Sequence, residues 1–321
     1  MDRTPDHDFA HLPVMAQEIV EAFAPVPAGW VVDATLGGAG HSVLLLGSLP
    51  QVKVLGIDQD PDALSVATQR LESYGDRART VRSRFDAISR LTAELLPAGE
   101  PVVGVLFDLG VSSPQLDRAE RGFSYRLDAP LDMRMDPSQS LSAAIVANDY
   151  DEAELVRVLR ENGDERFATR IARAVIAARP VTTTGQLAEL VRDAIPAPAR
   201  RRGGHPAKRT FQAIRIEVNA ELDVLPVALH DAVDILAPDG RLAVLSYHSG
   251  EDRIVKQVMR DAESGGCACP VGLPCVCGAV STLELIRRGG ITPSTDELSA
   301  NPRSESARLR VARRRDRSGR S

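Results

Sequence analysis

Two aspartates flank a glycine-rich turn near the N-terminus, and this arrangement is suited to holding an adenosine cofactor. A short apolar run stops at Asp33, and the turn 36–40 follows before a helical pattern opens. Glycines let the backbone approach a ligand closely, and a new helix presents free N–H groups. A second apolar run, 52–57, ends in Asp58, about 20 residues after Gly37. A carboxylate at that point can accept both hydroxyls of a ribose, so the pattern predicts an adenosine site.

The order of the acid and the glycines along the chain narrows the choice of cofactor. A glycine turn alone is common in α/β proteins, and Asp58 can equally cap the helix that starts near Pro61. The combination of both acids with the glycines favours the adenosine site. Asp33 precedes the glycines, unlike the acid of the G-x-G-x-x-G fingerprint, and there it can meet an amino-acid ammonium group. The pattern therefore favours S-adenosylmethionine over NAD.

A third acid, Asp108, ends the apolar run 102–107, which is typical of a strand buried on both faces. Ligands of open α/β sheets lie beyond the carboxyl ends of the strands, and Asp33, Asp58 and Asp108 all stand at such ends. Phe85 follows a third short strand. Its spacing alone fits either stacking on an adenine or filling the core at a strand end.

The elements that must position these acids alternate strand and helix up to Gln115, which predicts a parallel α/β sheet. From residue 116 the rhythm breaks into polar and then helical segments. A helix over 210–236 and a strand over 241–247 return to the sheet, and 307–313 alternates with period two, as an edge strand does. We expect a methyltransferase-type sheet domain in two parts, 1–115 and 209–313, an inserted helical domain, 116–208, and a basic disordered tail, 314–321.

Composition places the chain among soluble globular proteins. It has 321 residues, of which 43% are hydrophobic and 26% charged. No uncharged apolar run approaches the ~18 residues of a membrane span. Residues 1–9 hold three acids and no apolar core, so we expect no signal peptide. The cytoplasm is the default compartment, and no membrane partner is expected.

The net charge of −5 argues against a nucleic-acid partner, but its distribution argues for one. Residues 303–321 carry eight arginines against two acids. Local basic patches, not the total charge, form a phosphate footprint. The alternative is a solvated linker and a disordered end. A second basic cluster supplies the candidates for RNA contact: Arg200, Arg201, Arg202, His205, Lys208 and Arg209.

All four cysteines fall within eleven residues, at Cys267, Cys269, Cys275 and Cys277. Clustered thiols in a cytosolic chain are typical of zinc, and four thiolates complete a tetrahedral site. Both pairs are C-x-C, however, whereas the usual spacing is C-x₂₋₄-C. We therefore expect no metal, but reduced thiols or one oxidisable pair, with zinc as the alternative.

Long motifs between about residues 11 and 313 resemble those of the RsmH family of ribosomal RNA methyltransferases, also called MraW. Their length and their spread along the chain make chance a poor explanation. The motifs are H-L-P-V at 11–14, D-A-T-L-G-G-A-G-H-S at 33–42, G-I-D at 56–58, L-F-D-L-G-V-S-S-P-Q at 106–115, A-E-R-G-F-S at 119–124, L-D-M-R-M-D at 131–136, E-R-F-A at 165–168, H-P-A at 205–207, R-T-F-Q-A at 209–213, and Y-H-S with E-D-R within 247–253.

The resemblance implies a class I S-adenosylmethionine-dependent methyltransferase, a Rossmann-like sheet with an inserted mainly helical domain. It implies methyl transfer to N4 of a cytidine in the decoding region of 16S rRNA within the small ribosomal subunit. Two departures are visible: Ala39 replaces a common glycine, which is mild if φ there is negative, and Gly250 replaces a leucine. Carried over by motif, cofactor contacts fall on Ala39, Gly40, His41, Asp58, Phe85, Asp108 and Gln115.

Methylating a cytosine amine demands precise alignment, because its lone pair is delocalised into the ring. Many amino-methyltransferases orient the amine with a [DNS]-P-P-[YFW] loop after the fourth strand. Here Ser113 and Pro114, with Asp108 behind them, take that place, without the second proline and the aromatic residue. We hypothesise that Tyr247 or His248 stacks on or hydrogen-bonds the displaced base. The alternative for Tyr247 is core packing.

Other functions share parts of this pattern. A methyltransferase acting on another RNA base or on a protein would keep the cofactor site and differ in its acceptor. A non-catalytic ribosome-assembly factor would bind RNA without forming product. A nicotinamide oxidoreductase is disfavoured by the order of Asp33 and the glycines. Nothing in the sequence determines the oligomeric state, and a homodimer stays open.

Overall fold

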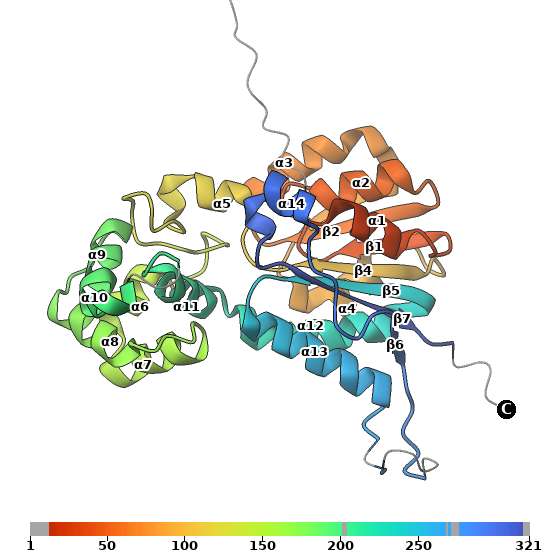
Figure 1. The fold of residues 1–321 in the computed structure, drawn as a ribbon. Helices are drawn as coiled ribbons and strands as arrows, with labels where there is room; N and C mark the ends of the chain where they lie inside the picture. The colour runs from red at the N-terminus through yellow and green to blue at the C-terminus, as the bar shows by residue number, and fades with distance from the viewer. Residues whose placement is uncertain (1–12, 201–203, 268, 271–275, 317–321) are drawn as a thin grey trace, which may run out of the picture. The chain divides into compact units, whose positions relative to one another are not determined.

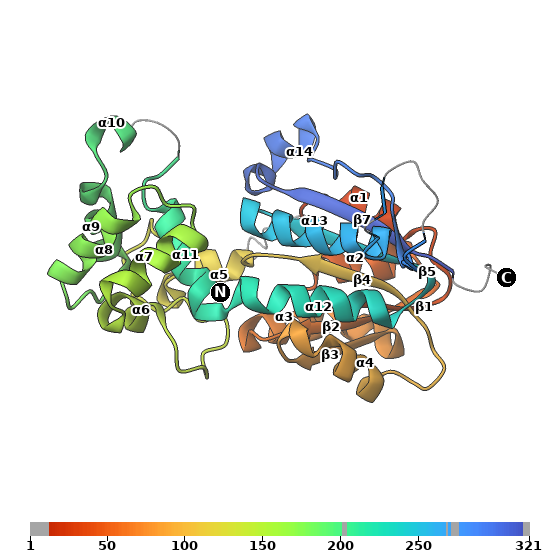
Figure 2. The same cartoon turned by 90° about the horizontal axis from the view of Figure 1, so that it is seen from below.

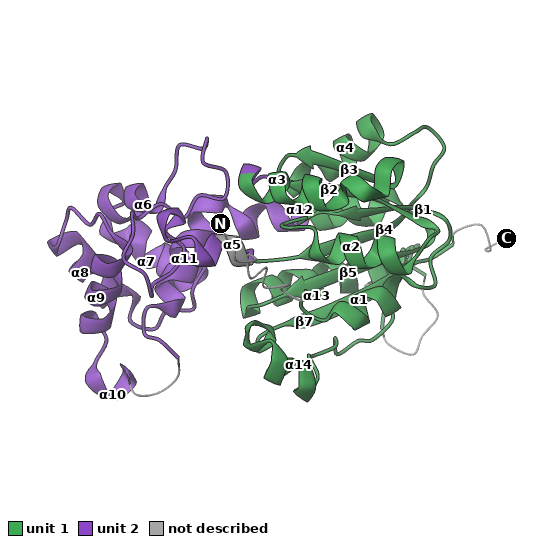
Figure 3. Ribbon diagram, turned by 90° about the horizontal axis from the view of Figure 1, so that it is seen from above, with its two compact units in different colours: residues 1–58, 62–110, 228–321 green, residues 59–61, 111–227 purple. Residues whose placement is uncertain are grey.

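The computed structural model describes residues 13–200, 204–267, 269–270 and 276–316, and these form two compact units (Figures 1 and 3). The sheet unit comprises residues 1–58, 62–110 and 228–321. The helical unit comprises residues 59–61 and 111–227.

The sheet unit is built on a mixed sheet that has seven strands in the described part of the chain. The first five pair in parallel, whereas β7 pairs antiparallel with both β5 and β6. Chain order reverses between β1 and β4, and such a switch point is where open α/β sheets bind ligands. In spatial order the strands are β3 (Ala78–Arg82), β2 (Val52–Asp58), β1 (Gly29–Asp33), β4 (Val102–Asp108), β5 (Leu236–Ser246), β7 (Arg308–Arg314) and β6 (Leu283–Leu285).

Helices cover both faces of this sheet, which is why its central strands are apolar throughout (Figures 1 and 2). Ile19 and Phe23 of α1 and Leu45 of α2 pack on one face against Val31 and Leu106. Figure 1 shows α12 and α13 on the opposite side. The helices associated with the sheet are α1 (Ala16–Phe23), α2 (Gly40–Ser48), α3 (Pro61–Leu71), α4 (Ile88–Leu95), α12 (Glu221–Ile235), α13 (Ser249–Ser264) and α14 (Thr295–Ala300), with 3₁₀ turns at Glu72–Arg77, Phe85–Ala87 and Pro302–Ser304.

The helical unit has its own apolar core. Leu155, Val158 and Leu159 of α7 repeat at helical spacing and are buried there, as the sequence pattern predicts. Complete capping boxes begin α7 at Asp151 and α9 at Thr183, and so satisfy free N–H groups of the first turns. The elements are α5 (Ser113–Asp117), a 3₁₀ turn (Ala119–Arg121), α6 (Ala143–Asp149), α7 (Glu152–Glu161), α8 (Ala168–Ala177), α9 (Thr184–Ala194), α10 (Ala197–Arg200) and α11 (Lys208–Asn219).

Three expectations about elements need correction. The segment 210–236 is not one helix, because Ala220 adopts φ 51° and separates α11 from α12. Phe211 and Ile214 of α11 lie in the core of the helical unit, so this unit extends to residue 227, beyond the expected boundary at 208. β7 is not an edge strand, because the three-residue β6 pairs with its outer side.

Among the helices built from described residues, none has both the length and the apolar character that a bilayer crossing requires. Several predictions of the sequence analysis lie outside the described residues: the roles of Arg201, Arg202 and Cys275, and most of the tail 314–321.

Candidate active site

The glycine-rich turn links the carboxyl ends of β1 and β2. Gly37 adopts φ 51°, and its N–H donates a hydrogen bond of 2.7 Å to Oδ2 of Asp58. Ala39 also has a left-handed backbone, with φ 62°. The replacement of glycine by alanine was expected to be mild only if φ were negative, and this condition is not met. The Ala39 side chain is fully buried. Ala39 precedes α2 without a side-chain cap, which leaves the first N–H groups of α2 for another acceptor.

Asp33 is buried at the end of β1, with 2% of its surface exposed. Its Oδ2 accepts a hydrogen bond of 2.6 Å from the Ser42 hydroxyl, and its Oδ1 accepts one of 3.3 Å from the Thr35 N–H. Burial raises the pKa of the Asp33 carboxyl, although Ser42 and His41 oppose the shift. A cation placed beside Asp33 would favour its charged form.

Asp108, at the end of β4, is fixed from two sides. Its Oδ1 accepts a hydrogen bond of 2.6 Å from the Tyr247 hydroxyl, and its N–H donates to Oγ1 of Thr35 at 2.6 Å. Its Oδ2 lies 3.5 Å from Nε2 of the buried His41. Neither ring nitrogen of His41 has a hydrogen-bond partner among the described residues. Buried polar atoms are normally paired, so His41 is suited to meet a bound group.

Tyr247 and His248 follow β5 and have different surroundings. The half-buried Tyr247 ring packs against the apolar cluster of α1 and the sheet. Burial and the Asp108 charge raise the pKa of Tyr247 well above its usual value, so its hydroxyl remains a donor. His248 caps α13: its Nδ1 faces the Glu251 N–H at 3.5 Å, and its Nε2 lies 3.1 Å from Oε1 of Glu251. Tyr247, which binds Asp108, and His248, which caps α13, are thus both held by contacts within the fold.

Phe85 lies in the 3₁₀ turn after β3, half-buried, with its ring at 85° to that of Phe107 and 5.7 Å between centroids. The ring therefore packs nearly perpendicular to the buried Phe107 ring, and its half-exposed position still permits stacking on a ligand. Asp58 is also half-exposed. The predicted stacking of Phe85 on an adenine stays a prediction.

The other predicted residues belong to the helical unit. Gln115 is buried, and its Oε1 accepts a hydrogen bond of 3.0 Å from the Ser112 N–H, while its Nε2 donates to Asp60 at 2.9 Å. Asp60 also pairs with Arg121 at 2.9 Å. The sequence analysis did not single out this buried pair, because residues 61 apart in sequence leave no periodic signal. The backbone of Ser113 and Pro114 begins α5 and does not form an irregular loop.

The basic candidates of the helical unit differ in their partners. Lys208 and Arg209 are exposed at the start of α11, and Arg209 donates to the Asp164 carbonyl at 3.0 Å. Arg200 donates to the Ile195 carbonyl at 2.6 Å. The exposed His205 ring stacks on Tyr125, with centroids 4.4 Å apart, and burial together with Arg126 lowers its pKa. These residues combine positive charge with an aromatic surface, as RNA-binding sites do.

The residues of the sheet unit fit S-adenosylmethionine. The buried Asp33 carboxylate suits an ammonium group, the uncapped start of α2 suits a carboxylate, and Asp58 suits ribose hydroxyls. The unpartnered nitrogens of His41 lie in the first turn of α2. These features surround the switch point of the sheet. The fold and the site define an S-adenosylmethionine-dependent methyltransferase, and S-adenosylmethionine is its cofactor.

Comparison with known proteins gives the particular family. The model of the MraW methylase family matches residues 8–315, and the chain belongs to that family. It is 49% identical to ribosomal RNA small subunit methyltransferase H of Heliobacterium mobile, covering 96% of this chain and 99% of that protein. It is 52% identical to the protein of the same name from Frankia alni, covering 95% of each chain. The family predicted from the motifs is therefore confirmed.

Among solved structures, an rRNA methylase from Streptococcus thermophilus aligns with a TM-score of 0.42 and 13% identity, covering 98% of this chain and 99% of that one.

Proposed function

We propose that this protein transfers a methyl group from S-adenosylmethionine to the exocyclic N4 amine of a cytidine in the decoding region of 16S rRNA in the small ribosomal subunit. The relatives' name supports the ribosomal RNA substrate. The observation that carries the chemistry is the Asp108 carboxylate, which Tyr247 holds at the end of β4. The cytidine position rests on the sequence motifs of the family.

The cofactor supplies an electrophilic methyl group on a positively charged sulfur. Asp33 would hold its ammonium group, the start of α2 its carboxylate, and Asp58 its ribose hydroxyls. Gly37, Ala39, Gly40 and His41 shape this part of the site, with Phe85 against the adenine. Gln115 remains a predicted contact.

Asp108 is suited to orient the acceptor. A cytosine amine becomes a better nucleophile when an acceptor binds one of its N–H groups and aligns the nitrogen with the methyl carbon. As the N–C bond forms and the C–S bond breaks, the nitrogen becomes acidic and can lose its proton to Asp108 or to water. Tyr247 acts as a positioning residue, because its hydroxyl binds Oδ1 of Asp108. The amine would then bind Oδ2, which lies 3.5 Å from Nε2 of His41.

The remaining members of the predicted catalytic set have supporting roles in this proposal. Ser113 and Pro114 stand at the start of α5, and their part in orienting the amine stays a prediction from the sequence. His248 caps α13 and so holds Tyr247 in place, since Glu251 binds both the His248 ring and the Tyr247 N–H, the latter at 2.7 Å. Direct contact of either aromatic ring with the base stays a prediction.

RNA binding is assigned to the helical unit. Lys208 and Arg209 present charge to solvent, and Tyr125 stacked on His205 offers a surface for an unpaired base. Arg126 lies over the Tyr125 ring, 5.9 Å from its centroid, and adds a further positive charge. Phosphate contacts of this kind supply affinity that falls steeply with salt.

The test is tritium transfer from labelled S-adenosylmethionine to small ribosomal subunits from cells that lack this protein, followed by nuclease digestion and nucleoside identification. We expect label in N4-methylcytidine. Label in another nucleoside would support methyltransferase activity but would refute the assignment of cytidine N4 as the acceptor. If no label appeared although calorimetry showed cofactor binding, the ribosomal substrate itself would be refuted.

A further inference from the structure

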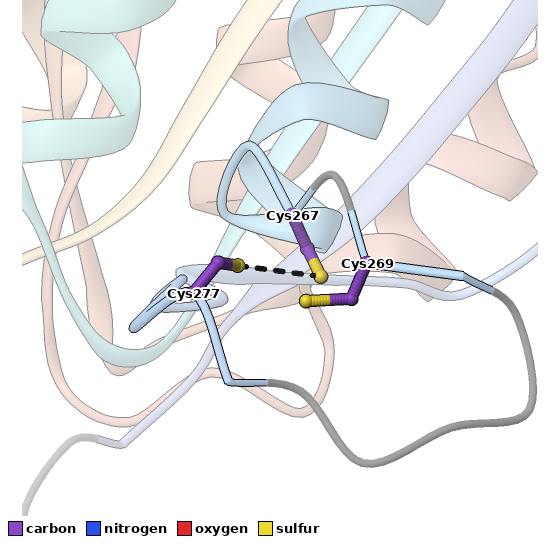
Figure 4. A group of neighbouring side chains, drawn as sticks. All are labelled: Cys267, Cys269 and Cys277. Carbon is purple, nitrogen blue, oxygen red and sulfur yellow. Dashed lines mark hydrogen bonds between the residues drawn. The ribbon is translucent and has the colours of Figure 1, made fainter.

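Three cysteine sulfurs converge in the segment between α13 and β6 (Figure 4). The Sγ atoms of Cys267, Cys269 and Cys277 all lie within 4.8 Å of one another, and those of Cys267 and Cys277 are 3.6 Å apart. The three side chains come from two sides of the loop and point toward one another. No described cysteine forms a disulfide. The convergence brings together thiols that are ten residues apart in sequence.

The spacing fits a shared metal ion better than a covalent link. A disulfide requires sulfurs about 2.05 Å apart and joins only two of them. In a tetrahedral zinc–thiolate site with Zn–S bonds of about 2.3 Å, neighbouring sulfurs are about 3.8 Å apart. The 3.6 Å between Cys267 and Cys277 is close to that edge length. The third sulfur, from Cys269, lies within 4.8 Å of the other two.

The backbone holds the Cys269 side chain in place. Main-chain N–H groups of Val276 and Cys277 donate hydrogen bonds to its sulfur. Hydrogen bonds of this kind support metal ligands from beyond the metal's own contacts and hold them in orientation.

The loop itself gives a physical reason for a metal. Its base is closed where the Thr282 N–H donates to the Ala262 carbonyl at 2.8 Å and where Gly265 lies against the backbone of Val280. Beyond that base the side chains of Val276 and Val280 are 89% and 57% exposed. Apolar burial therefore contributes little to ordering the described residues of this loop, and short segments without a core commonly depend on metals or disulfides.

We propose that Cys267, Cys269 and Cys277 form a structural zinc site that ties the end of α13 to the segment leading into β6. Each thiol releases its proton to solvent and binds as a thiolate, and a further donor completes the tetrahedron. Cys275 lies outside the described residues and is not part of this assignment. The proposal revises the expectation of no metal, which rested on the C-x-C spacing, because spatial convergence replaces sequence spacing as the criterion.

The test uses the full chain, purified under reducing conditions, with Zn²⁺ and Co²⁺ as probes. We expect about one zinc per chain and, with Co²⁺, the sulfur-to-metal charge-transfer band of a tetrahedral thiolate site. Cys267→Ser, Cys269→Ser and Cys277→Ser should each weaken zinc binding by more than the about 10–100-fold that loss of an outer-shell partner costs. Val276→Ser, an exposed change in the same loop, should bind zinc as the wild type does.

Two results would overturn the site: metal-free reduced protein that gives no cobalt–thiolate band, or cysteine variants that bind zinc as tightly as the wild type. Limited proteolysis tests the structural role separately and does not depend on methyl transfer. A chelator should accelerate cleavage within 266–279 in the wild type and in Val276→Ser, but not in the cysteine variants. Equal cleavage of the wild type with and without chelator would refute a role in ordering the loop.

Discussion

The sheet unit and the helical unit differ in how they hold the charged residues to which we assign a function. Asp33 is 2% exposed and Asp108 is held by Tyr247, whereas Lys208 and Arg209 lie in solvent. A buried charge is costly unless it has partners, so its geometry must be specified by neighbouring groups. An exposed charge needs no such support and acts over a Debye length. In the proposed function, methyl transfer therefore depends on the alignment of groups in the sheet unit, and RNA affinity depends on the charge of the helical unit.

Asp108 provides the sharpest test of this contrast. Asp108→Asn should lower the single-turnover rate of methyl transfer by about 10²–10³-fold, the typical cost of losing one oriented polar group at a reacting centre. RNA affinity and its salt dependence should not change, because the charge acts at the reacting amine. The measurement is rapid-quench transfer at saturating cofactor and RNA.

A matched control is Asp239→Asn, which alters an exposed aspartate of the same unit at a left-handed position that asparagine tolerates. Its rate should equal that of the wild type. A loss of less than tenfold in Asp108→Asn would contradict the orienting role of the carboxylate.

Asp33 tests whether a buried charge is kept for the cofactor at a cost to the fold. Its raised pKa means that the free protein loses stability as pH rises from the ordinary value of 3.8 through the raised pKa, because the folded state binds the proton more tightly. Asp33→Asn removes that loss and retains an acceptor for the Ser42 hydroxyl. Without cofactor, the variant should be at least as stable as the wild type at pH 7.

The same variant should bind S-adenosylmethionine about 10–100-fold more weakly, as expected when a hydrogen bond to a charged group is lost. Denaturant unfolding at several pH values and calorimetric titration separate the two effects. An Asp33→Asn protein that is less stable at neutral pH, or that binds the cofactor normally, would show that the carboxylate serves the fold and not the ligand.

The acids of the sheet unit could be found from sequence because local patterns determine them. Parallel strands end together at one edge of a sheet, so three apolar runs ending in aspartate are enough to bring Asp33, Asp58 and Asp108 to that edge. The short helix Ala16–Phe23 and the helix beginning at Gly40 likewise follow from periodicity and the glycine turn. Their side-chain partners are mostly close neighbours in sequence or lie on adjacent strands.

Contacts between residues far apart in the chain could not be predicted from the sequence. Nothing local indicates that Asp60 pairs with Arg121, or that Tyr247 binds Asp108 across 139 positions. β6 has only three residues and no detectable alternation, so the sequence does not reveal that β7 has a second neighbouring strand. The break at Ala220 carries no glycine or proline, and only the burial of α11 in another core reveals it.

The basic residues test the other half of the contrast. The double change Lys208→Ala and Arg209→Ala should weaken RNA binding several-fold and reduce the slope of log affinity against log salt by about 2, one for each lost phosphate contact. The methyl-transfer rate at saturating RNA should stay the same. Arg173→Ala, an exposed arginine of the same unit paired with Glu152 at 2.8 Å, is the control. Unchanged affinity and slope in the double variant would exclude this surface as an RNA contact.

Ala39 should give the smallest effect, since opposing contributions meet at one residue. Ala39→Gly relieves a left-handed backbone, which costs about 1–2 kcal/mol for a residue with a Cβ. It also removes a fully buried methyl group, worth about 0.8 kcal/mol, and adds freedom to the unfolded chain worth about 0.4–1 kcal/mol. We expect the free energy of unfolding to change by less than about 1 kcal/mol, measured by urea denaturation.

Ala67→Gly, in α3 and in the same apolar cluster, offers the comparison without a left-handed backbone, and it should be clearly destabilising. Equal losses in the two variants would show that φ at Ala39 carries no strain, and that the turn accepts alanine as readily as glycine.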